Sequence, residues 1–262
     1  IILFFYALTH LLNHSINILS LETASYIKEN IFRAIWKSYL GSVLLYGSFI
    51  IHIPLGLLSI ITRKSFRITL KEWLQILFII LALYVFVQHV AGTYILTRSF
   101  DSELPYSVLF SAMLMKPEEL TASTVMFSLM TLFIWVHGSI GMHTALTYKF
   151  KSYQSNFKKI MAVYIGVPIL GIFGFWAGLK EQSLSTTFSM TQGNDDFLIS
   201  SILEHVPVEA FPVIEPIEAL TLKYYPIFLL AIIFLATFNV IRTKYFGRLQ
   251  ITYPNGVTVK IP

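Results

Sequence analysis

The chain has 262 residues, of which 55% are hydrophobic and 13% are charged. A typical soluble domain carries about 25% charged residues, and here the apolar residues form blocks long enough to cross a bilayer, which argues against a soluble enzyme. The absence of cysteine excludes disulfides, thiolate metal sites and cysteine nucleophiles within this stretch. Because the chain begins inside an apolar run without methionine, we expect it to be part of a longer protein.

Six segments approach the roughly 20 apolar residues that a transmembrane helix needs. Lipid cannot satisfy an open backbone, so each of them is predicted to be helical. The predicted spans are 1–20, 42–61, 73–96, 122–147, 159–179 and 221–241. The sequence therefore predicts an all-α polytopic membrane protein, with a six-helix anchor over residues 1–245 and the lipid bilayer as its surroundings.

Basic residues are divided unevenly between the two sides of these spans. Eleven Lys or Arg and one acid, Glu72, follow the second, fourth and sixth spans, whereas the opposite connections hold seven basic and thirteen acidic residues. The positive-inside rule makes the basic side cytoplasmic, so both termini are predicted to be cytoplasmic. The net charge of +5 is then a topology signal, and no nucleic-acid partner is expected.

The outer connections are long. Residues 21–41 alternate apolar and charged side chains in a pattern that suits an amphipathic helix on the membrane surface. The 181–219 stretch is acidic, contains three prolines and Gly193-Asn194, and is predicted to be irregular.

Histidines carry the chemical signal. One lies in each of the first four spans, at His10, His52, His89 and His137, where polar groups are rare and functional by default. Helix rise places His52 and His137 near one level, and His89 nearer the outer face, where His10 can match it. Four histidines on successive helices are what a bundle needs to hold cofactors between its helices, through one imidazole nitrogen each.

Small residues follow three of these histidines, at Gly56, Gly92 and Gly141. A missing Cβ lets a flat macrocycle approach the helix, although small residues also serve helix packing. His14 and His143 are assigned to supporting or packing roles, and His205 to solvent. The arginines at span ends, Arg33, Arg63 and Arg98, suit haem propionates or an ordinary interfacial role. Taken singly, each membrane histidine also suits a hydrogen-bonding packing role.

The histidine pattern resembles the two-haem cytochrome b anchors of succinate:quinone and fumarate reductases. That family often carries its axial histidines as His-x-x-x-Gly, and His10-Leu-Leu-Asn13 is similar to its first span. The resemblance covers residues 1–147 and implies two haem b groups. His10 and His89 would hold the outer iron, and His52 and His137 the inner iron. His14 and His143 stand as competitors of His10 and His137.

The C-terminal segment 246–262 carries a second resemblance. Two alternating runs flank Asn255-Gly256, which is a hairpin signal, and the pair is similar to the start of a plant-type ferredoxin domain. Together with Thr9-His-Leu-Leu-Asn-His14 and Leu44-Leu-Tyr-Gly47, it resembles the membrane part of bacterial class III adenylate cyclases. This implies the bacterial inner membrane, a cytoplasmic 2Fe-2S domain with cysteines beyond Pro262, and a homodimer through the cyclase.

The leading hypothesis is a di-haem cytochrome b anchor that senses or relays redox state to a C-terminal adenylate cyclase. The stretch itself is then non-catalytic. A quinone-reactive cytochrome b subunit of a respiratory complex, with quinone as a partner, is one alternative. A haem-free membrane receptor or anchor is the other.

Overall fold

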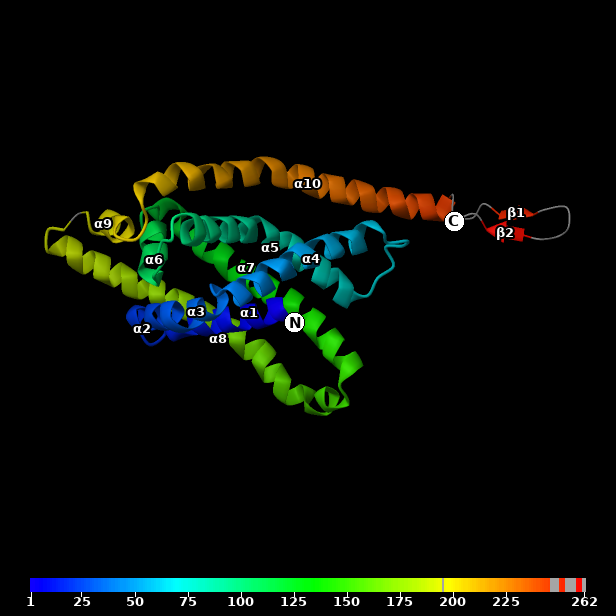
Figure 1. Cartoon of the computed structure of the whole chain (residues 1–262), viewed down its shortest axis with the longest axis horizontal. Helices are drawn as coiled ribbons and strands as arrows, with labels where there is room; N and C mark the ends of the chain where they lie inside the picture. Colours follow the sequence, from blue (N-terminus) through cyan, green and yellow to red (C-terminus); the bar gives the residue numbers. More distant parts are fainter. Residues whose placement is uncertain (195, 246–249, 253–257, 261–262) are drawn as a thin grey trace.

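The computed structural model describes residues 1–194, 196–245, 250–252 and 258–260, and helices dominate this part of the chain (Figure 1). Within these described ranges, five helical segments are long and apolar enough to cross a membrane. They contain α4 (Tyr39–Ile61), α5 (Leu70–Tyr94), α7 (Pro117–Lys149), α8 (Lys151–Thr191) and α10 (Phe211–Tyr245). Predicted spans two to six therefore coincide with long apolar helices.

The first predicted span, 1–20, forms a shorter helix. This helix, α1, covers Ile2–Ile16, and 15 residues at about 1.5 Å each fall short of a hydrocarbon core of about 30 Å. The described residues thus contain five helices of spanning length beside one short apolar helix, and the sixth crossing stays a prediction.

The segment after α1 is helical, as predicted, but it runs back along α1. It consists of α2 (Leu21–Ile27), the π-helix η1 (Lys28–Phe32) and α3 (Arg33–Trp36). Ser20 caps its start by accepting the Thr23 backbone N–H, and at its end Trp36 Nε1 donates to Thr9 Oγ1 at 3.1 Å. The segment and α1 therefore form a helical hairpin.

Local signals explain where α4, α5 and α7 begin. Ser38 caps α4, and Thr69 and Glu72 form a reciprocal capping box at the start of α5. Pro117 occupies the first turn of α7, where its missing N–H costs nothing. After α5 the chain passes through the π-helix η2 (Ile95–Ser99) and α6 (Tyr106–Leu114).

The prediction of an irregular 181–219 stretch is wrong. Helix α8 continues to Thr191, followed by α9 (Phe197–Leu203), the 3-10 helix η3 (Val208–Ala210) and α10. The polar residues after 179 end the apolar run but not the helix, because Gln182 and Thr186 are buried against other helices. The drop in hydropathy after residue 179 therefore marks the end of the predicted fifth span, whereas α8 itself continues to Thr191.

A short strand pair follows α10 in the chain. Strands β1 (Gln250–Thr252) and β2 (Thr258–Lys260) pair antiparallel, with Ile251 opposite Val259. This confirms the predicted strand pairing, while the predicted turn at Asn255-Gly256 lies outside the described residues. The ferredoxin assignment stays a prediction.

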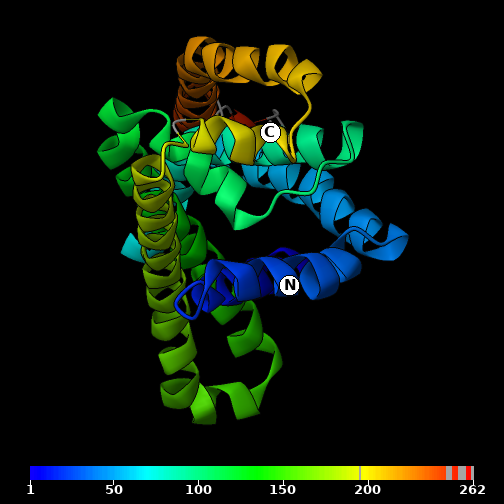
Figure 2. The same ribbon diagram turned by 90° about the vertical axis from the view of Figure 1, so that its left-hand side faces the viewer.

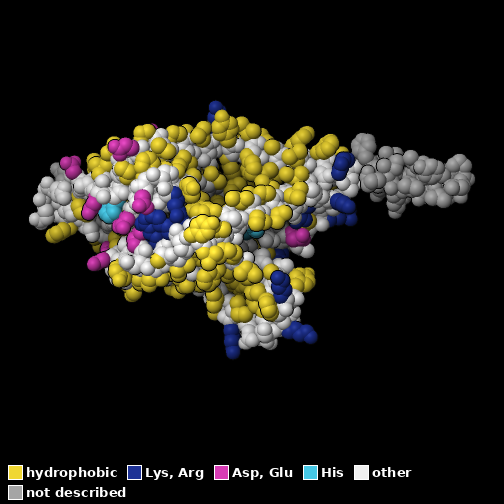
Figure 3. Space-filling view, in the orientation of Figure 1, with side chains coloured by type: hydrophobic (Ala, Val, Ile, Leu, Met, Phe, Trp, Pro, Cys, Tyr) yellow, Lys and Arg dark blue, Asp and Glu magenta, His cyan; other side chains and the backbone are white. Residues whose placement is uncertain are grey.

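The surface matches a membrane setting. Large apolar side chains such as Ile50 and Phe234 are 73% and 67% exposed, and Figure 3 shows hydrophobic side chains over most of the visible face. Acidic side chains gather at the end that carries α2 and α9, where a cluster of basic side chains also lies, and further basic side chains lie toward the opposite end and at the turn between α7 and α8. The acidic side chains are thus distributed asymmetrically in space.

Glycines of α8 set the position of α1. A Cβ at Gly174 would lie 2.0 Å from the His14 carbonyl oxygen, and one at Gly171 would lie 3.3 Å from Leu11 side-chain atoms. Gly178 similarly meets Phe110 and Leu21 side chains. The Gly174-x-x-x-Gly178 spacing is typical of closely packed membrane helices. These three residues, Gly171, Gly174 and Gly178, form a glycine seam that brings α1 into backbone contact with α8. Helix α10 lies at another edge of the bundle (Figure 2).

Replacing Gly174 by alanine should therefore destabilise the protein. The added methyl has no room beside the α1 backbone, and overpacking of this kind typically costs about 1–3 kcal/mol. We expect a lower Tm for G174A in thermal unfolding of the detergent-purified protein. Gly166 on the same helix is the control, because a Cβ there meets nothing within 4 Å. Equal Tm values for G174A and G166A would contradict the close packing.

Candidate functional site

A cavity of about 1040 Å³ lies inside the bundle. Helices α1, α4, α5 and α7 contribute its histidines, and α10 adds Phe228, Leu229 and Ile232. The walls are largely aliphatic and aromatic, and the volume reaches the upper end of the range for small-molecule sites. Five of the seven histidines line it, namely His10, His14, His52, His89 and His137.

The inner pair joins α4 and α7. The ring centres of His52 and His137 are 6.1 Å apart, at an interplanar angle of 76°. His137 Nδ1 lies 2.8 Å from the Gln75 carbonyl oxygen, and because a carbonyl only accepts, Nδ1 carries the hydrogen. The Nε2 atom of His137 is then left with a free lone pair, the tautomer that a metal ligand requires.

The outer pair joins α1 and α5. The ring centres of His10 and His89 are 6.0 Å apart, at an angle of 49°. His10 stacks on Tyr6 with ring centres 5.6 Å apart, and His89 meets the edge or face of Phe127 at 6.0 Å. Aromatic neighbours therefore hold both rings beside the cavity.

Both separations fit an ion held between two imidazoles. With metal–nitrogen bonds of about 2 Å on each side, the ring centres would lie about 6 Å apart, since each centre is about 1 Å behind its nitrogen. In the described part of the chain, no group of three or more His, Asp or Glu side chains could hold a metal ion. Two imidazoles at this separation are a donor set that fits a metal with two protein ligands, as in bis-histidine haem sites.

The three predicted glycines differ in their surroundings. Gly56 lines the cavity, and a Cβ there would meet nothing within 4 Å. Gly141 also lines it, but a Cβ there would lie 3.3 Å from Gln75 Nε2. Gly92 has open space around it yet does not line the cavity. Gly56 alone thus provides open space along the cavity wall in the way the sequence suggested.

The three remaining histidines lie in different surroundings. His14 lines the cavity beside His10. His143 lies outside it, with Nδ1 2.8 Å from the Tyr153 hydroxyl and its ring packed on Phe157 at 4.6 Å. His205 is partly buried, and its Nδ1 atom is buried without a hydrogen-bond partner among the described residues. The prediction of a simply solvated side chain is therefore wrong.

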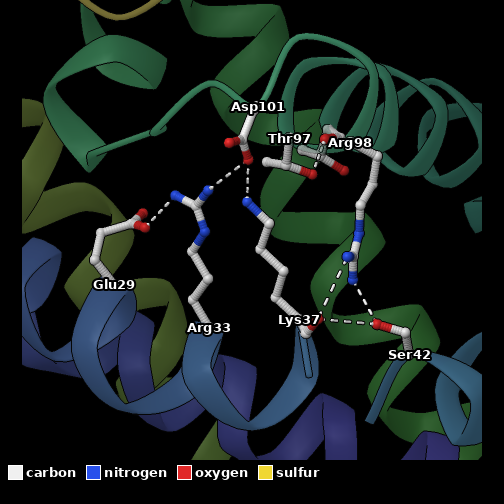
Figure 4. A network of polar contacts seen from close by, with 8 residues as sticks. Glu29, Arg33, Lys37, Ser42, Thr97, Arg98 and Asp101 are labelled. Atoms are coloured by element: carbon white, nitrogen blue, oxygen red, sulfur yellow. Dashed lines mark hydrogen bonds and ion pairs between the residues drawn. The ribbon is translucent and has the colours of Figure 1, made fainter. Parts of the chain in front are cut away.

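A polar network closes one wall of the cavity (Figure 4). Arg33 pairs with Glu29 at 2.5 Å and with Asp101 at 3.8 Å, and Lys37 also pairs with Asp101. Arg98 donates to Ser42 Oγ at 2.5 Å. Asp101 adopts a positive φ of 47°, which aspartate tolerates better than most residues.

This wall is rich in cations. Lys28, Arg33, Lys37 and Arg98 all line the cavity, and burial lowers the pKa of Lys28. At the other end of the cavity, Arg63 also lines it and pairs with Glu72 at 3.6 Å. The arginines singled out in the sequence therefore border the cavity at both ends, where they could face anionic groups of a cofactor.

Sequence reasoning missed two contributions to the site. The Gln75 carbonyl is a backbone group, so no residue type could mark it. The glycine seam of α8 carried a recognisable signal, the Gly174-x-x-x-Gly178 spacing, but it lies in a span without histidine. Both contributions act by orienting histidines on other helices.

Comparison with known protein families, with curated proteins and with solved structures gave no match to this chain. The function is therefore argued from the geometry of the histidines.

The Asp101 bridge predicts a pH-dependent stability. A hydrogen bond and ion pair with Lys37 lower the Asp101 pKa, so its stabilising contribution is complete above about pH 4 and is lost as the pH falls through the lowered pKa. D101N should unfold at a lower Tm at pH 7, and the difference from the wild type should shrink toward pH 3.

Glu204, an exposed carboxylate after α9, provides the control for this measurement. E204Q should change the Tm at pH 7 less than D101N does. A D101N variant with the wild-type pH profile would show that the bridge does not contribute to stability.

Proposed function

We propose that this chain is a di-haem b-type cytochrome membrane anchor that relays redox state to a following domain. The observation that carries the proposal is the presence of two histidine pairs, with ring centres 6.0 and 6.1 Å apart, in one apolar cavity. His10 and His89 would hold one haem, and His52 and His137 the other. Bound haem would supply one-electron chemistry.

The chain's own residues would set the conditions for that chemistry. The Gln75 carbonyl holds His137 in the tautomer with a free Nε2. Apolar walls that include Phe49 and Phe86 limit water in the cavity, and Gly56 leaves room beside α4. The cations at both ends, such as Arg98 and Arg63, are suited to carboxylate groups.

Helix α10 provides a physical route toward a following domain. It contributes Phe228, Leu229 and Ile232 to the cavity wall. A group bound in the cavity would therefore pack directly against α10. The Tyr225 hydroxyl donates to the Ile80 carbonyl of α5, and Asn239 Nδ2 donates to the Arg63 carbonyl after α4 at 2.9 Å. These contacts couple α10 to the two helices that carry His52 and His89.

The setting and the output are proposed from sequence features alone. The positive-inside rule supports cytoplasmic termini. The resemblance to class III cyclase anchors supports a bacterial inner membrane, a ferredoxin domain with its 2Fe-2S cluster beyond Pro262, and an adenylate cyclase dimer as the output.

Haem content of ligand variants tests the proposal. We expect H52A and H137A each to lose one of two haems, because each removes one iron ligand of the inner pair while the outer pair persists. The measurement is a pyridine haemochromogen assay with protein quantification on the detergent-purified chain. H143A is the matched control on α7, since His143 lies outside the cavity, and it should keep both haems.

Two results would overturn the proposal. A wild-type chain without haem after expression with ample haem would favour a receptor or structural anchor. Unchanged haem content in both H52A and H137A would show that the inner pair does not bind iron.

A further inference from the structure

The outer site contains a third imidazole. His14 follows His10 by one helical turn, and four-residue spacing places both rings on one face of α1. Their Nε2 atoms are 3.3 Å apart, and their rings are perpendicular with centres 4.7 Å apart. Both rings line the cavity that also contains His89. Two imidazoles of α1 thus lie next to each other in the cavity that His89 also lines.

The inner site has no third imidazole of this kind. His143 lies six residues after His137, so it does not share its helix face. It contacts Tyr153 and Phe157 instead of the cavity. Only His52 and His137 are available there, and the two sites therefore differ in the number of imidazoles that face each iron position.

Among the described residues, the His14 ring has no hydrogen-bond partner other than His10. Its Nδ1 is buried and has no hydrogen-bond partner among the described residues, which is costly for a ring nitrogen. Its ring touches Tyr106, with centres 5.0 Å apart, and Phe175, at 6.5 Å. Its polar contact is the His10 nitrogen, an atom that would be occupied once His10 binds iron.

The backbone of α1 is held in place at this point. A Cβ on Gly174 would lie 2.0 Å from the His14 carbonyl oxygen, so α1 rests directly on α8 here. Sliding α1 by a turn would break this contact and its neighbours. An exchange between His10 and His14 would therefore have to take place through their side chains, with α1 in place.

We infer that His14 is an alternative axial ligand of the outer site, so that His89 is matched by either His10 or His14. The inference rests on the proposed function. In the exchange, the His10 Nε2–iron bond breaks and a His14 Nε2–iron bond forms. Both rings stay neutral with their single hydrogen on Nδ1 in the ligated form, so no electron or proton is gained or lost overall.

Haem content of single and double variants tests the inference. Wild type, H10A and H14A should each hold two haems per chain, whereas H10A/H14A and H89A should hold one. In the inner site, H137A should lose one haem without rescue by His143. The assay is the pyridine haemochromogen measurement, combined with the low-temperature reduced spectrum, in which H10A should shift only the outer component.

The inner haem serves as an internal control for folding, because each outer-site variant should retain it. Loss of the outer haem in H10A to the same extent as in H10A/H14A, with the inner haem retained, would overturn the inference while leaving the proposed function intact. Two haems in the double variant would overturn it as well, because neither histidine of α1 would then be needed as a ligand. A wild-type chain without haem would defeat the proposed function itself.

If an alanine variant also loses its inner haem, it has not folded correctly. In that case H10Q and H10Q/H14Q replace the alanine variants, because glutamine retains a polar side chain at each position. The expected haem contents are the same, two and one.

Discussion

The backbone contact between α1 and the glycine seam of α8 is the constraint on which the outer site depends. Helix α1 has only 15 residues, and its position follows from packing more than from its own length. Gly174 lets the α1 backbone approach α8 at His14, and this places His10 across from His89 on α5. A bulkier residue would separate the helices and move the α1 imidazoles away from their partner.

The two histidine pairs are built differently around the same spacing. The inner pair has one defined tautomer, held by a backbone carbonyl, and its candidate competitor His143 lies outside the cavity. The outer pair has a competing imidazole and a wall of cations tied together through Asp101. Under the proposed function, one site would offer a single pair of ligands, and the other would allow an exchange of ligands beside a cationic wall. Both share a cavity with α10, which leads toward the C-terminal strands.

Five of the six spans predicted from the sequence are helices of spanning length among the described residues, because hydropathy reports directly on transfer into lipid, whereas the first span forms the shorter helix α1. Depth along the helices also separated the four histidines into the two pairs that lie close in space. Hydropathy could not predict the end of α8 at Thr191, because polar residues such as Gln182 continue the helix and are buried in the packed bundle. The roles of His14 and His143 likewise depended on which helix face meets a neighbour, and only the packed structure separates a cavity-lining ring from one held by Tyr153.

Electron paramagnetic resonance of the oxidised, detergent-purified chain tests the central claim most directly. Two facing imidazoles give low-spin ferric haem, and two different pairs should give two distinct low-spin signals that together integrate to about two haems per chain. A chain expressed with ample haem that shows no low-spin ferric signal would contradict the account and leave the histidines as packing residues of a haem-free anchor.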